Sequence, residues 1–140
     1  MKQTYIEPTE AAGAALFSSD IRGEVVMLNL LRFRETADYS ATPELSPETS
    51  ITGRQAFFRY VEHTKPFLEQ SGGELLFLGD GGRYFIGPED EQWDMVMLVK
   101  QQSLASFMAF ASDPDYLAGI GHRTAAILDS RLLPIVESKR

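Results

Sequence analysis

The feature that most constrains this chain is a stretch at residues 24–34 (EVVMLNLLRFR), in which apolar side chains do not alternate with polar ones. It is much shorter than the roughly 18 apolar residues that span a bilayer. An apolar run of this length favours a β-strand that is covered on both faces. The stretch therefore predicts a central strand of a sheet with a layer on each side.

Patterned segments before and after this strand predict the next elements. Residues 9–18 predict a short helix, and the capping-box pattern at residues 52–55 begins a longer helix that ends at the glycine pair of residues 72–73. Pro66 lies inside this second helix and predicts a kink or a break. Residues 74–86 fit either one long strand interrupted by a glycine bulge or a tight hairpin.

The second half of the chain repeats the alternation of strand and helix. Residues 93–100 predict a strand, Ser103 caps a helix that restarts at Pro114, and residues 132–136 predict the last strand. The order is a helix followed by β-α-β-β-α-β, which is typical of the ferredoxin-like α+β sandwich. We expect a single domain over residues 1–140, with residues 35–51 forming a long loop that acts as a flap.

The apolar character of two strands also predicts a partner. Both helices of a ferredoxin-like fold cover the same face of the sheet, so the other face should alternate apolar and polar residues if it meets water. Residues 25–33 and 93–99 place large apolar side chains on both faces instead. The simplest cover for the second face is the same face of another copy, which predicts a homodimer closed sheet to sheet.

Composition excludes several classes of function. The formal net charge is −7 and no block of basic residues is present, which argues against binding to nucleic acid or to an anionic membrane. The absence of cysteine excludes disulfides and thiolate catalysis, and two distant histidines are poor support for a metal site. The first residues show no signal-peptide core, so we expect a cytoplasmic protein.

The densest polar cluster lies in residues 119–135 (GIGHRTAAILDSRLLPI). If this run is helical, His122 and Asp129 lie about 20° apart around the helix axis, where a carboxylate can orient an imidazole that acts as a general base. Arg123 would then hold an anionic ligand. The alternative is a solvated polar stripe, with Asp129 already in the following strand.

Three further residues are candidates for a ligand-binding surface. Asn29 interrupts the most apolar strand, where its amide needs hydrogen-bond partners from a ligand or from the core. Tyr60 lies on the apolar side of the helix after residue 52, and its hydroxyl could reach the same pocket. Trp93 begins a strand and either lines a ligand cavity or packs in the core or an interface.

Four stretches resemble a known family: VVMLNLLRFR (residues 25–34), IGP (86–88), WDMVMLVK (93–100) and SDPDYLAGIGHRTAAILDSRLLPI (112–135). They are similar to the bacterial family catalogued as "domain of unknown function 1330", and the likeness covers roughly residues 24–136. That family belongs to the dimeric α+β barrel superfamily. The resemblance implies a ferredoxin-like fold that dimerises through its sheets, and it implies no established reaction.

Two functions fit these observations. In the first, a homodimer binds a small organic molecule between sheet and helices, and acts as a cofactor-independent oxygenase or an isomerase through His122 and Asp129. In the second, the protein is a non-catalytic dimeric module for ligand binding or structure. The superfamily includes haem enzymes, but neither histidine aligns with their axial ligand, so we expect no cofactor. Fold alone does not choose between chemistries.

Overall fold

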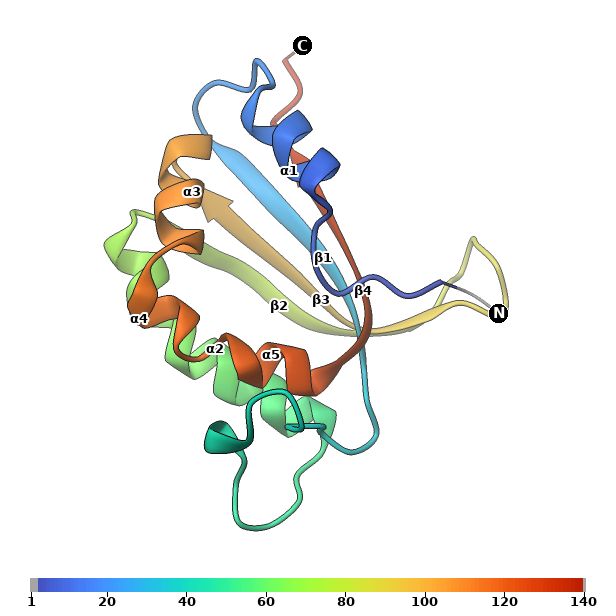
Figure 1. Cartoon of the computed structure of the whole chain (residues 1–140). Coiled ribbons are helices and arrows are strands. Elements are labelled where there is room, and N and C mark those ends of the chain that lie inside the picture. Colours follow the sequence, from blue (N-terminus) through green and yellow to red (C-terminus); the bar gives the residue numbers. More distant parts are fainter. Residues whose placement is uncertain (1–2, 140) are drawn as a thin grey trace.

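A four-stranded antiparallel sheet with strand order β2-β3-β1-β4 forms the centre of the fold. The computed structural model describes residues 3–139 (Figure 1). Its elements are α1 (Glu10–Phe17), β1 (Val25–Phe33), the 3-10 helix η1 (Pro43–Leu45), α2 (Gly53–Gln70), β2 (Glu74–Arg83), β3 (Gln92–Gln101), α3 (Leu104–Ala111), α4 (Pro114–Leu117), α5 (Ile120–Ala126) and β4 (Ile127–Ile135). This order and strand arrangement confirm the predicted ferredoxin-like α+β fold, with α1 as the extra N-terminal helix.

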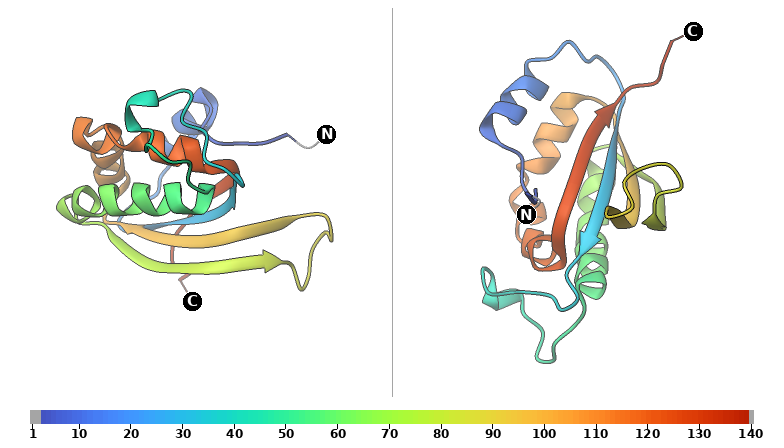
Figure 2. Two further views of the ribbon diagram at one scale, coloured as in Figure 1. Left: turned by 90° about the horizontal axis from the view of Figure 1, so that it is seen from below. Right: turned by 90° about the vertical axis from the view of Figure 1, so that its right-hand side faces the viewer.

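All the helices lie on one face of the sheet (Figure 2, left). The helix α2 packs against α5 across this layer, and its apolar side chains face β1 and β3. The centre of the core is made of fully buried side chains from the sheet and from α2. These are Leu31, Met95, Ala56 and Phe57, with Ile127 at the start of β4.

The helix ends follow from local hydrogen bonds. Thr9 caps α1 and Ser103 caps α3 through their side chains, as the sequence predicts. Thr52 and Gln55 form the predicted capping box of α2, with both reciprocal bonds present. The expected break at Pro66 is wrong, because α2 continues as one helix to Gln70. Buried side chains on both sides of the proline keep the two halves of α2 on the same core, which offsets the lost N–H bond.

Two strand predictions need correction. Residues 74–83 form the continuous strand β2, so the tight hairpin is wrong, and the bulge lies between Leu75 and Phe77 rather than at a glycine. The last strand begins at Ile127, five positions before the predicted start, because α5 ends at Ala126. Leu128 and Leu132 are 37% and 46% exposed, since β4 is an edge strand with no neighbour outside it.

Strand register separates the sheet into two different faces. Cross-strand pairs such as Leu31 with Met95 face the helices, whereas Leu28 pairs with Leu98 and with Leu133 on the other side. We call this other side the open face, because none of the helices covers it (Figure 2). Its apolar residues are only partly buried or exposed: Val26, Leu28, Leu30, Phe77, Val96, Leu98, Leu133 and Ile135.

Candidate functional site

His122 is held by the long loop over residues 35–51. It lies on α5, and Tyr39 of the loop is within hydrogen-bond distance of its Nδ1 atom, at 2.8 Å. The Tyr39 ring is buried and meets the imidazole edge to face. A neutral imidazole whose Nδ1 atom accepts a hydrogen bond from the phenol carries its own proton on Nε2. The structure thus pairs His122 with a tyrosine, where the sequence suggested a carboxylate.

The glycines beside His122 allow this loop and the neighbouring helix to approach closely. A Cβ atom on Gly121 would lie 2.4 Å from the Oγ1 atom of Thr42, a residue of the loop. A Cβ atom on Gly119 would lie 2.2 Å from the ring of His63 on α2. Both distances are shorter than side chains tolerate. The GIGH motif is therefore explained by close packing of α5 against the loop and α2.

The electrostatic environment keeps His122 neutral. Burial lowers its pKa from the ordinary value of 6.5, and the charges of Arg59 and His63 on α2 lower it further. Burial also raises the pKa of the Tyr39 hydroxyl, so this group stays protonated and able to donate. The pair is thus a neutral phenol–imidazole hydrogen bond at neutral pH.

Asp129 does not orient His122. The helix α5 ends before it, so the helical step of about 100° per residue no longer relates the two positions. The Asp129 carboxylate accepts from the backbone N–H groups of Tyr5 and Ser130 and forms an ion pair with Arg131 at 2.7 Å. Asp129 lies in the following strand, as the alternative interpretation held, but its side chain is largely buried rather than solvated. Its role is to fasten the N-terminal segment to the edge strand β4.

The other residues predicted between sheet and helices also have structural partners. The Asn29 amide donates to the carbonyl oxygens of Met27 and Met97 in its own sheet. The Tyr60 hydroxyl is 2.7 Å from that of Tyr116, and burial is the main cause that raises the pKa of Tyr116. Arg123 donates to the Ile6 carbonyl at 2.7 Å. Neither His122 nor any of these residues lines the cleft at the end of the sheet or the open cleft around Ile21 and Val136.

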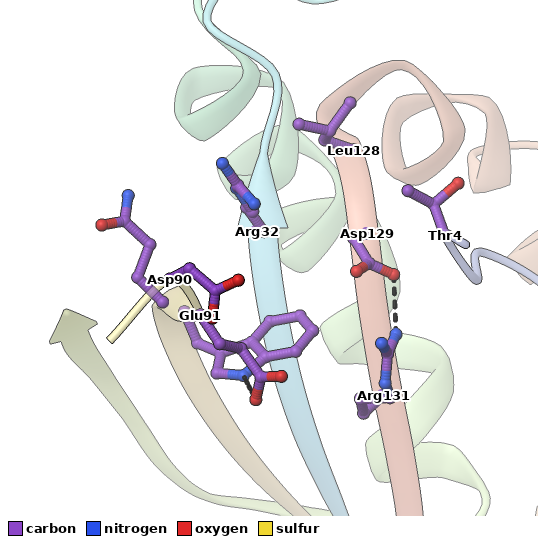
Figure 3. A pocket seen from close by; sticks show the side chains of 9 residues that line it. Thr4, Arg32, Asp90, Glu91, Leu128, Asp129 and Arg131 are labelled. Atoms are coloured by element: carbon purple, nitrogen blue, oxygen red, sulfur yellow. Dashed lines mark hydrogen bonds and ion pairs between the residues drawn. The ribbon is translucent and has the colours of Figure 1, made fainter. Parts of the chain in front are cut away.

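One cleft contains two predicted residues, Trp93 and Asp129, and it lies at the end of the sheet where β1, β3 and β4 meet the N-terminal segment (Figure 3). Its volume is about 140 Å³. We call it the Arg32 cleft, and its lining consists of Thr4, Arg32, Asp90, Glu91, Gln92, Trp93, Leu128, Asp129 and Arg131.

Two arginines and an indole dominate this cleft. The Arg131 guanidinium lies 5.1 Å from the Trp93 ring centre and 4.8 Å from that of Tyr5, while its Nη1 atom binds Asp129. The Trp93 indole donates to the Tyr84 hydroxyl at 2.7 Å and to Glu91 at 3.3 Å, which fixes its ring. Sequence reasoning did not select Arg131 for this site, because its position depends on how β4 pairs with β1.

Arg32 differs from Arg131 in having no ion-pair or hydrogen-bond partner within residues 3–139. Its side chain is partly buried at the cleft, opposite Asp129 in the strand register (Figure 3). The sequence contained a signal for Arg32. It follows Leu28 and Leu30 on the strand face that the sequence predicts to be covered by a partner, where a charged residue is unexpected. A guanidinium held in this way can bind an anion.

Other classes of site find no support in the described part of the chain. Between residues 3 and 139, no group of three or more histidine, aspartate or glutamate side chains is placed to hold a metal ion. None of the helices in that range combines the length and the apolar character needed to cross a membrane.

The strand order, the single helical layer and the cleft at the sheet end together define a ferredoxin-like α+β protein. Two solved structures resemble the chain over almost its whole length. The RPA0582 protein of unknown function from Rhodopseudomonas palustris is 33% identical with a TM-score of 0.86, covering 99% of this chain and 100% of that one. The methylated RPA0582 protein is 34% identical, with the same TM-score and coverage of 97% and 96%. The chain belongs to the family of the RPA0582 protein.

More distant structures share less of the chain's geometry. A dimeric protein of unknown function with a ferredoxin-like fold from Bacteroides fragilis has a TM-score of 0.48 and 12% identity, covering 80% of this chain and 94% of that one. A scan against protein-family models and a search of curated proteins gave no match.

Proposed function

We propose that the protein is a homodimer, closed through the open faces of two sheets, that binds a small organic anion in the Arg32 cleft. The proposal of a dimer is supported by the open face, where Leu133 is 57% exposed and Phe77 is 56% exposed in the single chain. Contiguous apolar surface of this kind marks an interaction site. A second copy offers the same apolar surface and can cover it in a two-fold arrangement.

The observation that carries the proposal of a ligand is the unpartnered guanidinium of Arg32 beside the Trp93 indole. A planar guanidinium binds a carboxylate through two parallel hydrogen bonds, and an indole ring packs against a flat apolar group. The neighbouring Arg131 adds positive charge, although Asp129 already neutralises most of it. The best ligand is therefore a carboxylate attached to a small planar body.

The size of the cleft supports a small ligand and a role for the partner subunit. Its volume of about 140 Å³ is below the roughly 300–1,000 Å³ of pockets that enclose drug-sized molecules. Two of the lining residues, Asp129 and Arg131, lie on strand positions that face the open side in the register with β1. In a sheet-to-sheet dimer, the partner would lie close to this side of the cleft and add to its wall.

Light scattering with analytical ultracentrifugation tests the dimer. We expect the wild-type chain to be dimeric at micromolar concentration and Leu133→Glu to raise the dissociation constant about a hundredfold, because the substitution buries a charge in each half of the interface. A matched exposed leucine in the helical layer, Leu117, serves as the control in Leu117→Glu. A monomeric wild-type chain would contradict the proposal.

Trp93 is the only tryptophan, so its fluorescence reports on the cleft directly. We expect benzoate to change the emission in a saturable way and benzyl alcohol, which lacks the carboxylate, to change it far less. Arg32→Gln should weaken the benzoate response at least about tenfold, which is typical for loss of a charged hydrogen bond. Arg22→Gln, at an exposed arginine outside the cleft, should leave the benzoate response unchanged. An equal response in both variants would contradict the proposal.

A second candidate function is acid–base chemistry at His122, as in a cofactor-independent oxygenase or an isomerase. The lowered pKa of His122 supports this candidate, because it keeps the imidazole neutral, and Nδ1 can accept a proton once a ligand displaces the Tyr39 hydroxyl. A thermal-shift screen with metabolites, carried out on the wild type, His122→Gln and Arg32→Gln, separates the two candidates. Stabilisation that is lost in His122→Gln and kept in Arg32→Gln would favour the second candidate, and the opposite pattern the first.

We also propose that the RPA0582 family corresponds to the one catalogued as domain of unknown function 1330, in the dimeric α+β barrel superfamily. The motifs in residues 25–34, 86–88, 93–100 and 112–135 support this assignment. The assignment carries no reaction with it.

A further inference from the structure

The β2–β3 hairpin extends beyond the rest of the sheet. The strand β1 pairs with β3 only as far as Leu31 with Met95, whereas β2 continues to pair with β3 up to Arg83 with Gln92. Residues 82–93 therefore project beyond the end of the sheet, on the side away from α3 and α4 (Figure 1). We call this segment the arm.

The arm carries the two most exposed large apolar side chains among the described residues. Phe85 is 101% exposed and Ile86 is 87% exposed. Both stand at the tip, next to the end of β2, where no other part of the described chain covers them. Large apolar side chains placed together on a projecting tip indicate a surface that another molecule covers.

Hydrogen bonds at its base give the arm a defined shape. The Tyr84 hydroxyl donates to the Glu91 carboxylate across the loop at 2.5 Å, and the Trp93 indole donates to the same hydroxyl. The bond to Glu91 raises the pKa of Tyr84, so the phenol stays protonated. Residue 84 on one side of the tip is thereby tied to residues 91 and 93 on the other, so that Phe85 and Ile86 are presented outward.

We propose that the arm docks on the second copy of this chain, with Phe85 and Ile86 as its apolar anchors. This inference rests on the dimer proposed above. The arm is the outer end of the strands that contribute Phe77, Val96 and Leu98 to the open face, so its apolar tip continues the surface that the partner covers. An arm that overhangs its own sheet reaches protein in a two-fold dimer only on the partner.

The contact also completes the ligand site. Asp90, Glu91, Gln92 and Trp93 belong to the arm and form one wall of the Arg32 cleft. Binding of the tip by the partner fixes this wall, because the tie between Tyr84, Glu91 and Trp93 joins the tip to the cleft. Dimerisation and the affinity for a carboxylate are therefore coupled.

Sedimentation equilibrium with two double variants tests the arm. Phe85→Ser with Ile86→Ser should raise the dimer dissociation constant at least about tenfold, the usual result of removing apolar anchors from an interface. Phe58→Ser with Leu117→Ser removes two exposed apolar side chains from the helical layer and should leave the constant unchanged. Both anchors are almost fully exposed in the single chain, so their loss should leave its circular dichroism spectrum unchanged.

The outcomes separate the arm from the dimer. A dimeric wild-type chain whose dissociation constant does not change in the arm variant overturns the docking and leaves the dimer standing. A wild-type chain that is monomeric at 100 µM, a concentration of about the size that weak dimers need, overturns both. The chain has no cysteine, so Ile86→Cys introduces a unique site for a thiol-linked photo-crosslinker. Crosslinked dimer is expected, and crosslinks found only within one chain contradict the proposal.

Discussion

The two faces of the sheet bury their apolar residues to very different degrees. Leu31 and Met95 on the helix side are almost completely buried, and Asn29 and Tyr60 have hydrogen-bond partners within the chain. Leu28 and Leu133 on the open side remain partly or largely exposed. The helix side thus forms the hydrophobic core of the single chain, whereas the apolar side chains on the open side are buried only if another molecule covers them.

This difference decides which polar residues are available for function. Asn29 and Tyr60 use their hydrogen-bonding groups to satisfy the core, so a ligand would have to replace existing bonds. Arg32 lies on the strand positions that face the open side and keeps its guanidinium without a partner among residues 3–139. A polar residue in an apolar strand therefore indicates a binding site only when the fold leaves its polar atoms unsatisfied.

A pair of leucine substitutions gives the largest expected effect. Leu31→Ala should lower the free energy of unfolding by about 2–5 kcal/mol, because it leaves a cavity in a close-packed core. Leu133→Ala, at the same residue type on the open face, should change it by about 0.5 kcal/mol or less in the monomer. Urea titrations at a protein concentration below the dimer dissociation constant measure both values.

Equal losses for the two leucines would break the contrast between the faces. Such a result would mean that the open face is already covered within one chain. A concentration-dependent loss for Leu133→Ala, seen only where the wild type is dimeric, would sharpen the contrast and support the sheet-to-sheet interface.

The helical layer offers a second pair with opposite expected signs. Gly121→Ala should lower the free energy of unfolding by about 1–3 kcal/mol, since the new methyl group meets Thr42 and Leu45 of the loop. Gly13→Ala in α1 meets nothing within 4 Å and should raise it by about 0.5–1 kcal/mol. Thermal and chemical denaturation of both variants checks the signs. A neutral Gly121→Ala would show that the loop does not pack tightly on α5.

The fold could be predicted because its signals are local and repeated. The apolar strand at residues 25–33, the capping box at Thr52 and the helix caps at Thr9 and Ser103 each depend on neighbours in sequence. The sequence placed the start of β4 too late. No glycine or proline marks the end of α5, and the chain leaves the helix at Ile127 because it pairs there with the distant strand β1. Tertiary pairing overrides local pattern at such a boundary.

The candidate site was harder to predict for the same reason. His122 and Asp129 are close in sequence, but the turn from helix to strand at Ile127 separates their partners. Tyr39 lies 83 positions from His122 and Asp94 accepts the N–H of Phe33 from 61 positions away. Contacts over such distances in sequence cannot be predicted from the spacing of residues within a short segment. Of the six predicted site residues, only Trp93 and Asp129 line the Arg32 cleft, and Asp129 does so in a structural role.

The smallest expected effect is on the pKa of His122, which lies in the helical layer rather than on the open face. Its pKa is lowered from the ordinary 6.5, chiefly by burial and next by Arg59, so the unfolded chain binds its proton more readily than the folded chain. Stability from the neutral imidazole is fully present above pH 6.5 and is lost as the pH falls from 6.5 through the folded pKa. A proton NMR titration should place the His122 midpoint below 6.5.

Arg59→Gln should raise this midpoint by a few tenths of a unit, roughly the effect of one screened charge. Arg54→Gln should leave the midpoint unchanged, because Arg54 is paired with Asp80. A midpoint at or above 6.5 in the wild type would mean that water reaches the imidazole freely. The Tyr39 contact would then no longer hold the loop closed over α5.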